Sequence, residues 1–291
     1  MSAIGLLIVE GNSDLQFMAW LNRSGYSVKS CGGKGQMRAV MQSYASIENN
    51  AEKYNPKHIV AFRDRDFDFP MPKIPTCSLS NQKSYDPAND FPVFISHRRT
   101  LENYLIRPED YVAFLEAKQE DLKWLPKASE YNQRLHQAAV DIRYHQAVRA
   151  ALGEVRRMND IGTNLLASNG ESLRSGVLPD LLGEDACLES AAEILNRYRE
   201  NAVQIGDYGN FENAYQRYIS SFDADFYASA KYLEWFQGKD LIAAFNLKWL
   251  GASQRFPWNS LHKYTLLNFD HTQFPDLVEF RLILQQRLSQ N

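Results

Sequence analysis

The sequence predicts an α/β protein: an N-terminal part in which strands and helices alternate, followed by an all-α C-terminal region. Two observations lead to this prediction. Short apolar runs in the first hundred residues, such as 4–9 and 58–62, are separated by amphipathic helical stripes. Beyond Pro108 strand-like runs largely disappear, while the helical spacing of apolar residues continues. This alternation favours a mostly parallel sheet covered on both faces, so we expect one domain at residues 1–108 and a second at 109–291.

The first strand and helix are predicted directly after the start of the chain. Residues 4–9 form the strand, and Ser13 to Gln16 are typical of a capping box that opens a helix, which Gly25 closes. Residues 26–30 form a second strand. The glycines from residue 32 to 35 lack the spacing of a phosphate-binding loop, so we interpret them as a turn.

A second helix follows this turn, because an apolar stripe at helical spacing extends from Met37 to Ile47. The third strand is expected at residues 58–62 and the fourth at 93–96. A proline-rich stretch from Pro70 to Pro92 separates the two strands.

The region after residue 108 shows further helical stripes, for example from Tyr208 to Phe222 and from Leu277 to Leu288. We interpret its many aromatic residues mainly as core, with a stacking surface as the minority alternative. Residues 160–185 are rich in Gly, Ser and Asn, which is typical of an exposed loop or hinge. One predicted helix carries basic residues that we interpret as a solvated face, with a nucleic-acid groove as the alternative: Arg143, Arg149, Arg156 and Arg157.

The composition is that of an ordinary globular protein, with 291 residues, 44% hydrophobic and 23% charged, and a net charge of −3. It argues against disordered, fibrous and membrane classes, and any binding of nucleic acid must depend on a local basic patch or on metal. The cysteines, Cys31, Cys77 and Cys187, have neither zinc-site nor disulfide-framework spacing, which favours a reducing cytoplasm. The first apolar run is too short to cross a membrane, so we expect no membrane partner.

Acidic residues follow two of the predicted strands. Glu10 comes directly after the first strand, and Asp64 and Asp66 follow the third. Because the carboxyl ends of parallel strands meet at one edge of a sheet, these acids are placed where ligands bind. If the chain stays extended, Asp64 and Asp66 point to the same face and share a divalent cation such as Mg²⁺. The alternative is a solvated loop in which Arg63 and Arg65 neutralise the acids.

These residues resemble a known family. Residues 10–14, Glu-Gly-Asn-Ser-Asp, are similar to the first motif of the Toprim domain, a Rossmann-like domain with a mostly parallel sheet, and residues 64–66 resemble its metal-binding motif. Residues 99–106 with Pro108 are similar to the ENYL signature of a Toprim-like group found in bacterial defence loci. That group includes the nuclease subunits of phage anti-restriction-induced systems and is related to overcoming-lysogenisation-defect nucleases. Residues 238–241 add a weak similarity.

The resemblance implies a set of catalytic and metal-binding residues. Glu10 takes the place of the Toprim glutamate that serves as general acid or base and is also an implied metal ligand, and Asp64 and Asp66 take the place of the metal-holding pair. Asp14 and Glu102 are the implied additional ligands. The implied cofactor is Mg²⁺, with Mn²⁺ as the alternative, because such ions activate water for phosphodiester hydrolysis.

Basic residues near these acids are candidates for binding substrate phosphates. Arg98 and Arg99 follow the fourth predicted strand and could act as fixed cations, or they could form ion pairs with Glu102 or other acids of the site. Lys34 begins the connection after the second strand and is a third candidate.

The function implied by the resemblance is a metal-dependent endonuclease, the toxic cytoplasmic effector of an anti-phage defence system. Its implied substrate is transfer RNA and its implied partner a separate ABC-type ATPase subunit, with self-association as a homodimer. Topoisomerases and primases with this domain need larger modules than 291 residues hold. One alternative is a catalytically silent Toprim-like binding module on an ATPase scaffold. Another is a DNA endonuclease, whose ATPase would be a second protein because no Walker motif occurs here. Residues 109–291 are expected to bind a partner, to oligomerise or to contribute to the substrate site.

Overall fold

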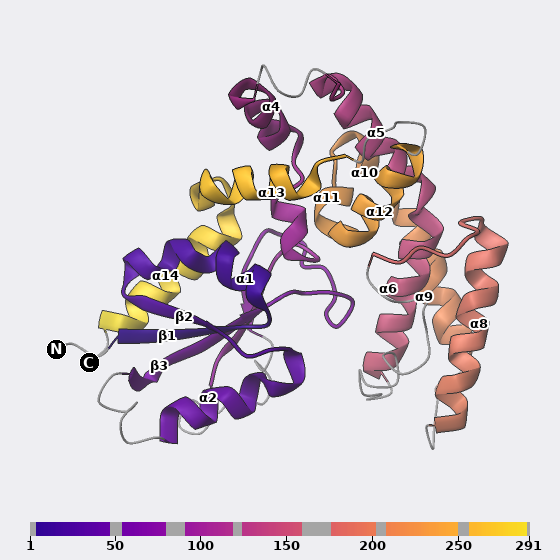
Figure 1. Ribbon diagram of the computed structural model, residues 1–291. Coiled ribbons are helices and arrows are strands. Elements are labelled where there is room, and N and C mark those ends of the chain that lie inside the picture. The colour runs from indigo at the N-terminus through magenta and orange to yellow at the C-terminus, as the bar shows by residue number, and fades with distance from the viewer. Residues whose placement is uncertain are drawn as a thin grey trace. The chain divides into compact units, whose positions relative to one another are not determined.

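The computed structural model describes residues 4–46, 54–79, 91–118, 124–158, 176–201, 208–249 and 256–289. The chain forms two compact units. The first, which we call the α/β unit, comprises Met1–Arg65, Pro72–His97 and Leu266–Asn291. The second, which we call the helical unit, comprises Asp66–Met71 and Arg98–Thr265. Figure 1 shows the elements of each unit.

This division corrects the single boundary expected at residue 108. The C-terminal helix α14 (Pro275–Ser289) belongs to the α/β unit, because Phe280 packs against Phe62 and Phe94 with ring centroids 4.9 and 5.1 Å apart. Conversely, residues 98–108 belong to the helical unit, where their side chains form the hydrogen bonds described below. The short segment 66–71 also belongs to the helical unit.

The α/β unit contains a five-stranded sheet in the order β2-β1-β3-β5-β4. The first four strands in this order are parallel, and β4 lies antiparallel at the edge. The predicted α/β class with a mostly parallel sheet is therefore confirmed. The strands are β1 Ile4–Val9, β2 Tyr26–Ser30, β3 Tyr54–Arg63, β4 Ser78–Leu79 and β5 Val93–Ile95.

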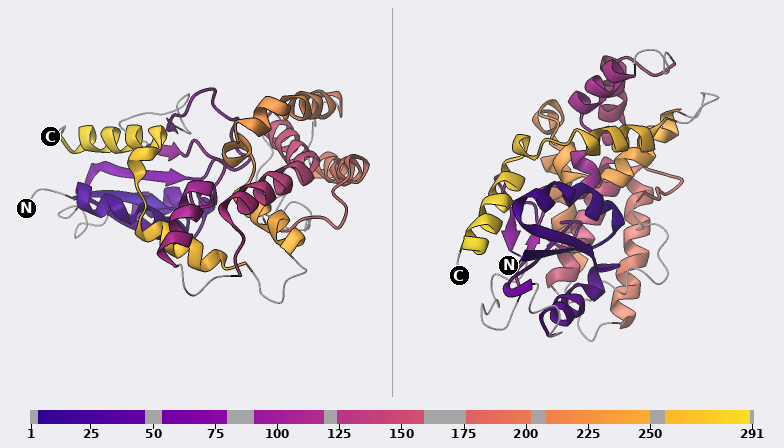
Figure 2. Two further views of the ribbon diagram at one scale, coloured as in Figure 1. Left: turned by 90° about the horizontal axis from the view of Figure 1, so that it is seen from above. Right: turned by 60° about the vertical axis from the view of Figure 1, so that its left-hand side comes forward.

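Helices cover both faces of this sheet, as the alternating sequence predicted. Leu6, Ile8 and Ala61 point to one face and share a buried cluster with Met37 and Met41 of α2 (Met37–Ser46). The opposite face is covered by α14 and by α1 (Asn12–Phe17), which continues as the 3₁₀-helix η1 (Met18–Ser24) to Gly25 (Figures 1 and 2). Gly25 has a φ of 84°, the left-handed conformation that favours glycine at a helix end.

The helical unit contains no strand within its described residues. Its helices pack around a core rich in aromatic side chains, including Tyr111, Tyr131, Phe236 and Phe245. The stripe predicted from Tyr208 to Phe222 corresponds to α9, and Phe211, Tyr215 and Phe222 are buried, as expected for core. The expected loop at 160–185 falls mostly outside the described residues, and α8 begins at Glu184. The helices that lie wholly or mostly in this unit are α4 Pro108–Ala117, α5 Ala128–Asp141, α6 Arg143–Met158, α8 Glu184–Asn201, α9 Tyr208–Ser221, α10 Ala224–Ala228, α11 Tyr232–Trp235, α12 Gly238–Trp249 and α13 Trp258–Leu267, with the 3₁₀-helix η3 Leu101–Tyr104.

Candidate functional site

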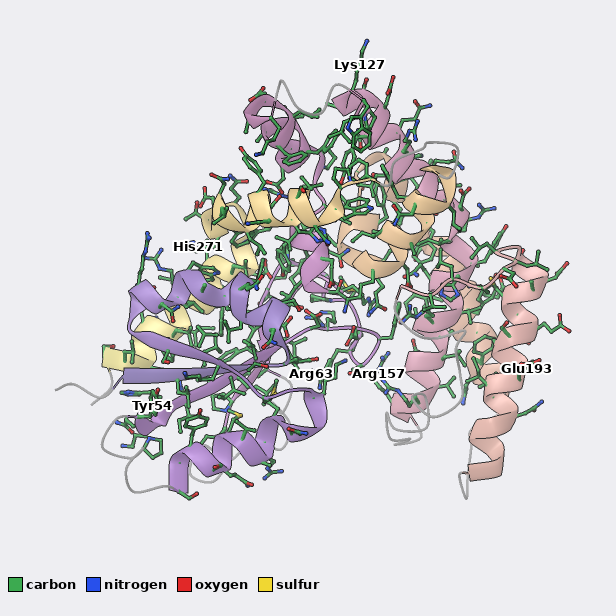
Figure 3. The ribbon with its side chains drawn as sticks, viewed as in Figure 1. Tyr54, Arg63, Lys127, Arg157, Glu193 and His271 are labelled. Carbon is green, nitrogen blue, oxygen red and sulfur yellow. The ribbon has the colours of Figure 1, made fainter. Side chains whose placement is uncertain are left out.

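The ends of β1 and β3 carry two of the predicted site residues side by side. Val9 pairs with Phe62 in the parallel ladder, so Glu10 lies level with Arg63, and Asp64 lies one residue further along β3. The Nε of Arg63 is 3.4 Å from Oε1 of Glu10. Figure 3 marks Arg63 at the end of β3 opposite to Tyr54. From β1 the chain passes to β2 on one side and to β3 on the other, so this edge is the point where the strand order reverses.

Such a reversal point is where open α/β sheets bind ligands, outside the carboxyl ends of the strands. The α/β unit therefore places Glu10 and Asp64 at the ligand-binding edge of its sheet. Of the two arginines expected to neutralise the acids, Arg63 forms an ion pair with Glu10. Arg65 is buried instead, and its Nε donates to the carbonyl oxygens of Ser96 and His97 at 2.9 and 3.2 Å.

The turn after β2 reaches the same edge. The Ser30 hydroxyl donates to the Glu10 carbonyl oxygen at 3.3 Å, and the Cys31 amide donates to the Val9 carbonyl at 2.9 Å. Burial raises the pKa of the Cys31 thiol, and the Glu10 carboxylate adds to this effect. Gly33 has a φ of 140° and leads into the 3₁₀-helix η2 (Lys34–Gln36), which α2 follows from Met37. Lys34 begins this segment.

Asp14 has a local structural task that differs from the expected capping box. The helix begins two residues earlier than Ser13 to Gln16 implied, because Gly11 is the N-cap and Asp14 occupies the third helical position. The Gly11 amide donates to Oδ2 of Asp14 at 2.8 Å. A carboxylate three residues into a helix can reach back to the N-cap amide in this way. The metal-ligand role of Asp14 stays a prediction.

Asp66 belongs to the helical unit and departs from the extended conformation. Its φ is 41°, so the argument that an extended chain turns Asp64 and Asp66 to the same face does not hold. The Asp66 amide donates to the Arg99 carbonyl at 2.8 Å, and Nη1 of Arg99 donates to the Asp66 carbonyl. A left-handed conformation is uncommon for Asp and persists only where surrounding contacts hold it. These contacts with Arg99 hold the backbone of Asp66.

Phe67, the next residue, lies between two guanidinium groups. The Cζ atoms of Arg99 and Arg149 are 4.5 and 4.6 Å from the ring centroid of Phe67. Nη1 of Arg157 donates to the Phe67 carbonyl at 2.6 Å, and Arg156 forms an ion pair with Asp68.

Arg149 and Arg156 of α6 therefore do not lie on the solvated face that the sequence indicated. Arg149 and Arg156 are buried, with 7% and 4% of their surface exposed. Both contact the segment that follows β3: Arg156 donates to the Asp68 carboxylate, and Arg149 lies over the Phe67 ring while it donates to Asp240. The charge pattern of a helix does not distinguish a solvated face from one that packs against another segment of the chain, which is why the expectation failed.

The ENYL segment binds the start of α12. The Gly238 amide donates to Thr100 Oγ1 at 3.2 Å and to Asn103 Oδ1 at 3.1 Å, and Asn103 Nδ2 donates to the Phe236 carbonyl at 2.9 Å. Asn103 is fully buried. The weakly similar residues 238–241 thus meet the ENYL segment directly, a relation that sequence alone did not reveal.

The remaining predicted residues of this segment also contact the helical unit. Nζ of Lys239 is 3.5 Å from Oε1 of Glu102. Nη1 of Arg98 donates to the carbonyls of Asn103 and Leu233 at 2.8 and 3.1 Å. Arg99 Nε donates to the Trp235 carbonyl at 3.0 Å, and the side chain is buried. Both arginines therefore hold backbone in place; contact with substrate phosphates stays a prediction for Arg98, Arg99 and Lys34.

Sequence analysis missed a buried polar cluster centred on Asp240, which is fully buried. Its carboxylate accepts hydrogen bonds from Arg149, from Gln146 Nε2 at 2.7 Å and from the Gly176 amide at 2.7 Å. Burial lowers the pKa of the neighbouring His145 to about 4, and the positive charge of Arg149 contributes to this shift. The sequence marked Arg149 only as one of several basic residues on a helix and Asp240 only as part of the weak similarity of residues 238–241, because these residue types are common on exposed helix faces.

The donor chemistry of the α/β unit fits a hard divalent cation, because Glu10 and Asp64 supply carboxylate oxygens at one sheet edge. Asp14 belongs to the same unit, while Asp66 and Glu102 belong to the helical unit. Among the residues that the structure describes, no group of three or more His, Cys, Asp and Glu side chains is arranged to hold a metal ion. The complete ligand set therefore stays a prediction.

Comparisons with protein-family models and with curated proteins find no match to this chain. Within the described residues, no helix combines the length and the apolar character needed to pass through a membrane.

Proposed function

We propose that the protein is a metal-dependent phosphodiester hydrolase that cleaves nucleic acid, with RNA such as transfer RNA as the favoured substrate. The observation that carries this proposal is the position of Glu10 and Asp64, which follow adjacent parallel strands where the strand order reverses. Ligands of open α/β sheets bind at this point. The resemblance of residues 10–14 and 64–66 to Toprim motifs favours phosphodiester chemistry there.

Three residues carry the chemistry in this proposal. Glu10 is the general acid or base, and Asp64 and Asp66 are ligands of Mg²⁺, or of Mn²⁺ as the alternative, with Asp14 and Glu102 as additional ligands. When bound, the ion stabilises charge on the attacking and leaving oxygens and lowers the pKa of a bound water. Arg63, 3.4 Å from Glu10, offers a fixed cation for a substrate phosphate at the same edge.

The biological role follows from the ENYL resemblance of residues 99–106. It supports a toxic cytoplasmic effector of anti-phage defence whose activity is controlled by a separate ABC-type ATPase subunit. Lys34, Arg98 and Arg99 would contact substrate phosphates, and the helical unit would bind the ATPase or a second copy of the chain.

A second candidate function is a catalytically silent binding module on an ATPase scaffold. One observation favours it: the Glu10 carboxylate is already in an ion pair with Arg63. A carboxylate in an ion pair with a neighbouring arginine must break that ion pair before it can bind a metal ion or accept a proton from water.

Cleavage assays on the purified full-length chain separate these functions. Transfer RNA and duplex DNA are incubated with Mg²⁺, with Mn²⁺ or with EDTA, and Glu10→Gln is compared with the wild type. The matched control is Glu154→Gln, which removes a carboxylate paired with the exposed Arg217 at 2.6 Å. RNA cleavage that EDTA and Glu10→Gln both abolish supports the proposal. Metal-dependent cleavage of DNA alone establishes the DNA endonuclease instead. Cleavage that survives EDTA contradicts metal dependence, and ATPase binding without cleavage of either substrate establishes the silent module.

A further inference from the structure

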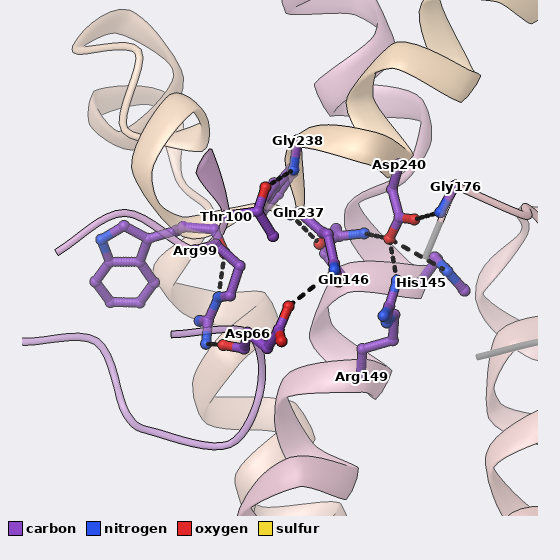
Figure 4. A network of polar contacts seen from close by, with 12 residues as sticks. Asp66, Arg99, Thr100, His145, Gln146, Arg149, Gly176, Gln237, Gly238 and Asp240 are labelled. Carbon is purple, nitrogen blue, oxygen red and sulfur yellow. Dashed lines mark hydrogen bonds and ion pairs between the residues drawn. The ribbon is translucent and has the colours of Figure 1, made fainter. Parts of the chain in front are cut away.

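The carboxylate of Asp66 is held by a side chain that no motif pointed to. Gln237 Nε2 donates to Oδ1 of Asp66 at 3.1 Å, although 171 positions separate the two residues in the sequence. Both residues belong to the helical unit. Figure 4 shows Gln237 and Asp66 within one continuous polar network.

Gln237 is itself fixed by this network. Its amide donates to Oε1 of Gln146 at 2.9 Å, and Gln146 Nε2 donates to Asp240, which also accepts from Arg149 and Gly176 (Figure 4). Gln237 and Gln146 are each 1% exposed, and Asp240 is 0% exposed. Buried polar networks of this kind have few alternative arrangements, because moving one member leaves another without its hydrogen bond.

The backbone of Asp66 is fixed as well, through the two hydrogen bonds with Arg99 and the φ of 41°. With the backbone fixed, rotation about the side-chain bonds is the freedom that remains to the carboxylate. The hydrogen bond from Gln237 restricts that rotation and directs Oδ1 of Asp66 toward Gln237. The direction of the second carboxylate oxygen, Oδ2, is thereby fixed as well.

We infer that Gln237 is a positioning residue: it orients the Asp66 carboxylate for the divalent cation and contacts neither substrate nor metal itself. The inference rests on the proposed function, in which Asp66 is a metal ligand. Hydrogen-bond partners of metal ligands fix ligand orientation, and their loss typically weakens metal binding by about 10- to 100-fold.

The test measures Mn²⁺ binding directly, from the electron paramagnetic resonance signal of free Mn²⁺ titrated into the full-length protein. Gln237→Met has a similar volume but removes the donor, and we expect the dissociation constant for Mn²⁺ to rise about tenfold. The matched control is Gln137→Met on α5. Gln137 is exposed and donates to Asp141 at 2.9 Å, so its loss removes the same type of hydrogen bond and leaves Mn²⁺ binding unchanged.

A double-mutant comparison distinguishes positioning from a general loss of structure. Asp66→Asn alone should weaken Mn²⁺ binding, and Gln237→Met added to Asp66→Asn should have no further effect, because Gln237 acts through that carboxylate. If Gln237→Met fails to fold, Gln237→Asn serves in its place, since it keeps a polar side chain but is too short to reach Asp66.

The outcomes distinguish a failure of the positioning role of Gln237 from a failure of the metal-ligand role of Asp66. If Asp66→Asn weakens Mn²⁺ binding while Gln237→Met and Gln237→Asn bind as the wild type does, the positioning role is wrong and the proposed function stands. If the wild type does not bind Mn²⁺, or Asp66→Asn binds it equally well, Asp66 is not a metal ligand, and both proposals are wrong at this site. Additive losses in the double variant show that Gln237 acts independently of Asp66 and overturn the inference.

Discussion

Substitution of Gly153 by alanine tests how the segment after β3 is held. Gly153 lies within α6, and a Cβ atom placed there would be 2.4 Å from the carbonyl oxygen of Phe67. Ordinary contacts begin at 3.4 Å, so the overlap is 1.0 Å, the difference between these two values. The opposing atom is backbone, and Arg157 donates to the same oxygen at 2.6 Å, so the segment cannot yield without loss of other contacts.

Two effects of opposite sign determine how much Gly153→Ala changes the free energy of unfolding. Replacing glycine by alanine inside a helix stabilises by about 1 kcal/mol, whereas inserting a methyl group into a filled space costs about 1–3 kcal/mol. Because the neighbour is a backbone carbonyl rather than the end of a flexible side chain, we place the cost in the upper part of that range. The expected net result is a loss of about 1–2 kcal/mol in the free energy of unfolding.

Urea unfolding followed by tryptophan fluorescence measures this difference, with cleavage activity as a second readout. Activity should fall as well, because the displaced Phe67 adjoins Asp66. The control is Gly35→Ala, where no atom lies within 4 Å of the added Cβ and stability should not fall. A Gly153→Ala protein at least as stable as the wild type would refute the close packing of Phe67 on α6.

Three further predictions concern the network and the site. Asp240→Asn leaves the buried Arg149 without its carboxylate and should lower the free energy of unfolding by about 3–5 kcal/mol in urea titrations. The control, Glu154→Gln at the exposed pair with Arg217, should lower it by less than about 1 kcal/mol. Equal losses in the two variants would contradict the buried network. His145 has its pKa lowered by burial from 6.5 to about 4, so the unfolded state binds its proton more readily. The free energy of unfolding should therefore fall by about 3 kcal/mol as pH decreases from 6.5 to 4, and a His145→Gln variant with an unchanged pH slope would contradict this. Asp66→Asn should abolish cellular toxicity and metal-dependent cleavage yet keep a cooperative thermal melt; toxicity that persists shows the acid to be dispensable, and a lost melt shows it to be a determinant of folding.

Local patterns in the sequence determined the elements of the α/β unit. The apolar run at residues 4–9 predicted β1 at its observed bounds, since a strand buried on both faces has a continuous run of apolar residues. The strand predicted at residues 26–30 also matches β2. The stripe from Met37 predicted α2, and the acids after β1 and β3 could be located at strand ends. These features depend only on residues near one another in the chain, and hydrophobic periodicity records such relations directly.

Tertiary structure alone decided which elements meet. Strand order placed β1 beside β3 and so brought Glu10 and Asp64 to one edge. The return of α14 to the sheet and the inclusion of 66–71 and 98–108 in the helical unit replaced the single domain boundary expected at residue 108. Arg149 was interpreted as solvated because its charge says nothing about burial, and Gln237 was overlooked because its partner lies 171 positions away. Hydrogen bonds between residues so far apart produce no periodic pattern in the sequence, because the residues meet only when the chain folds and its helices pack together.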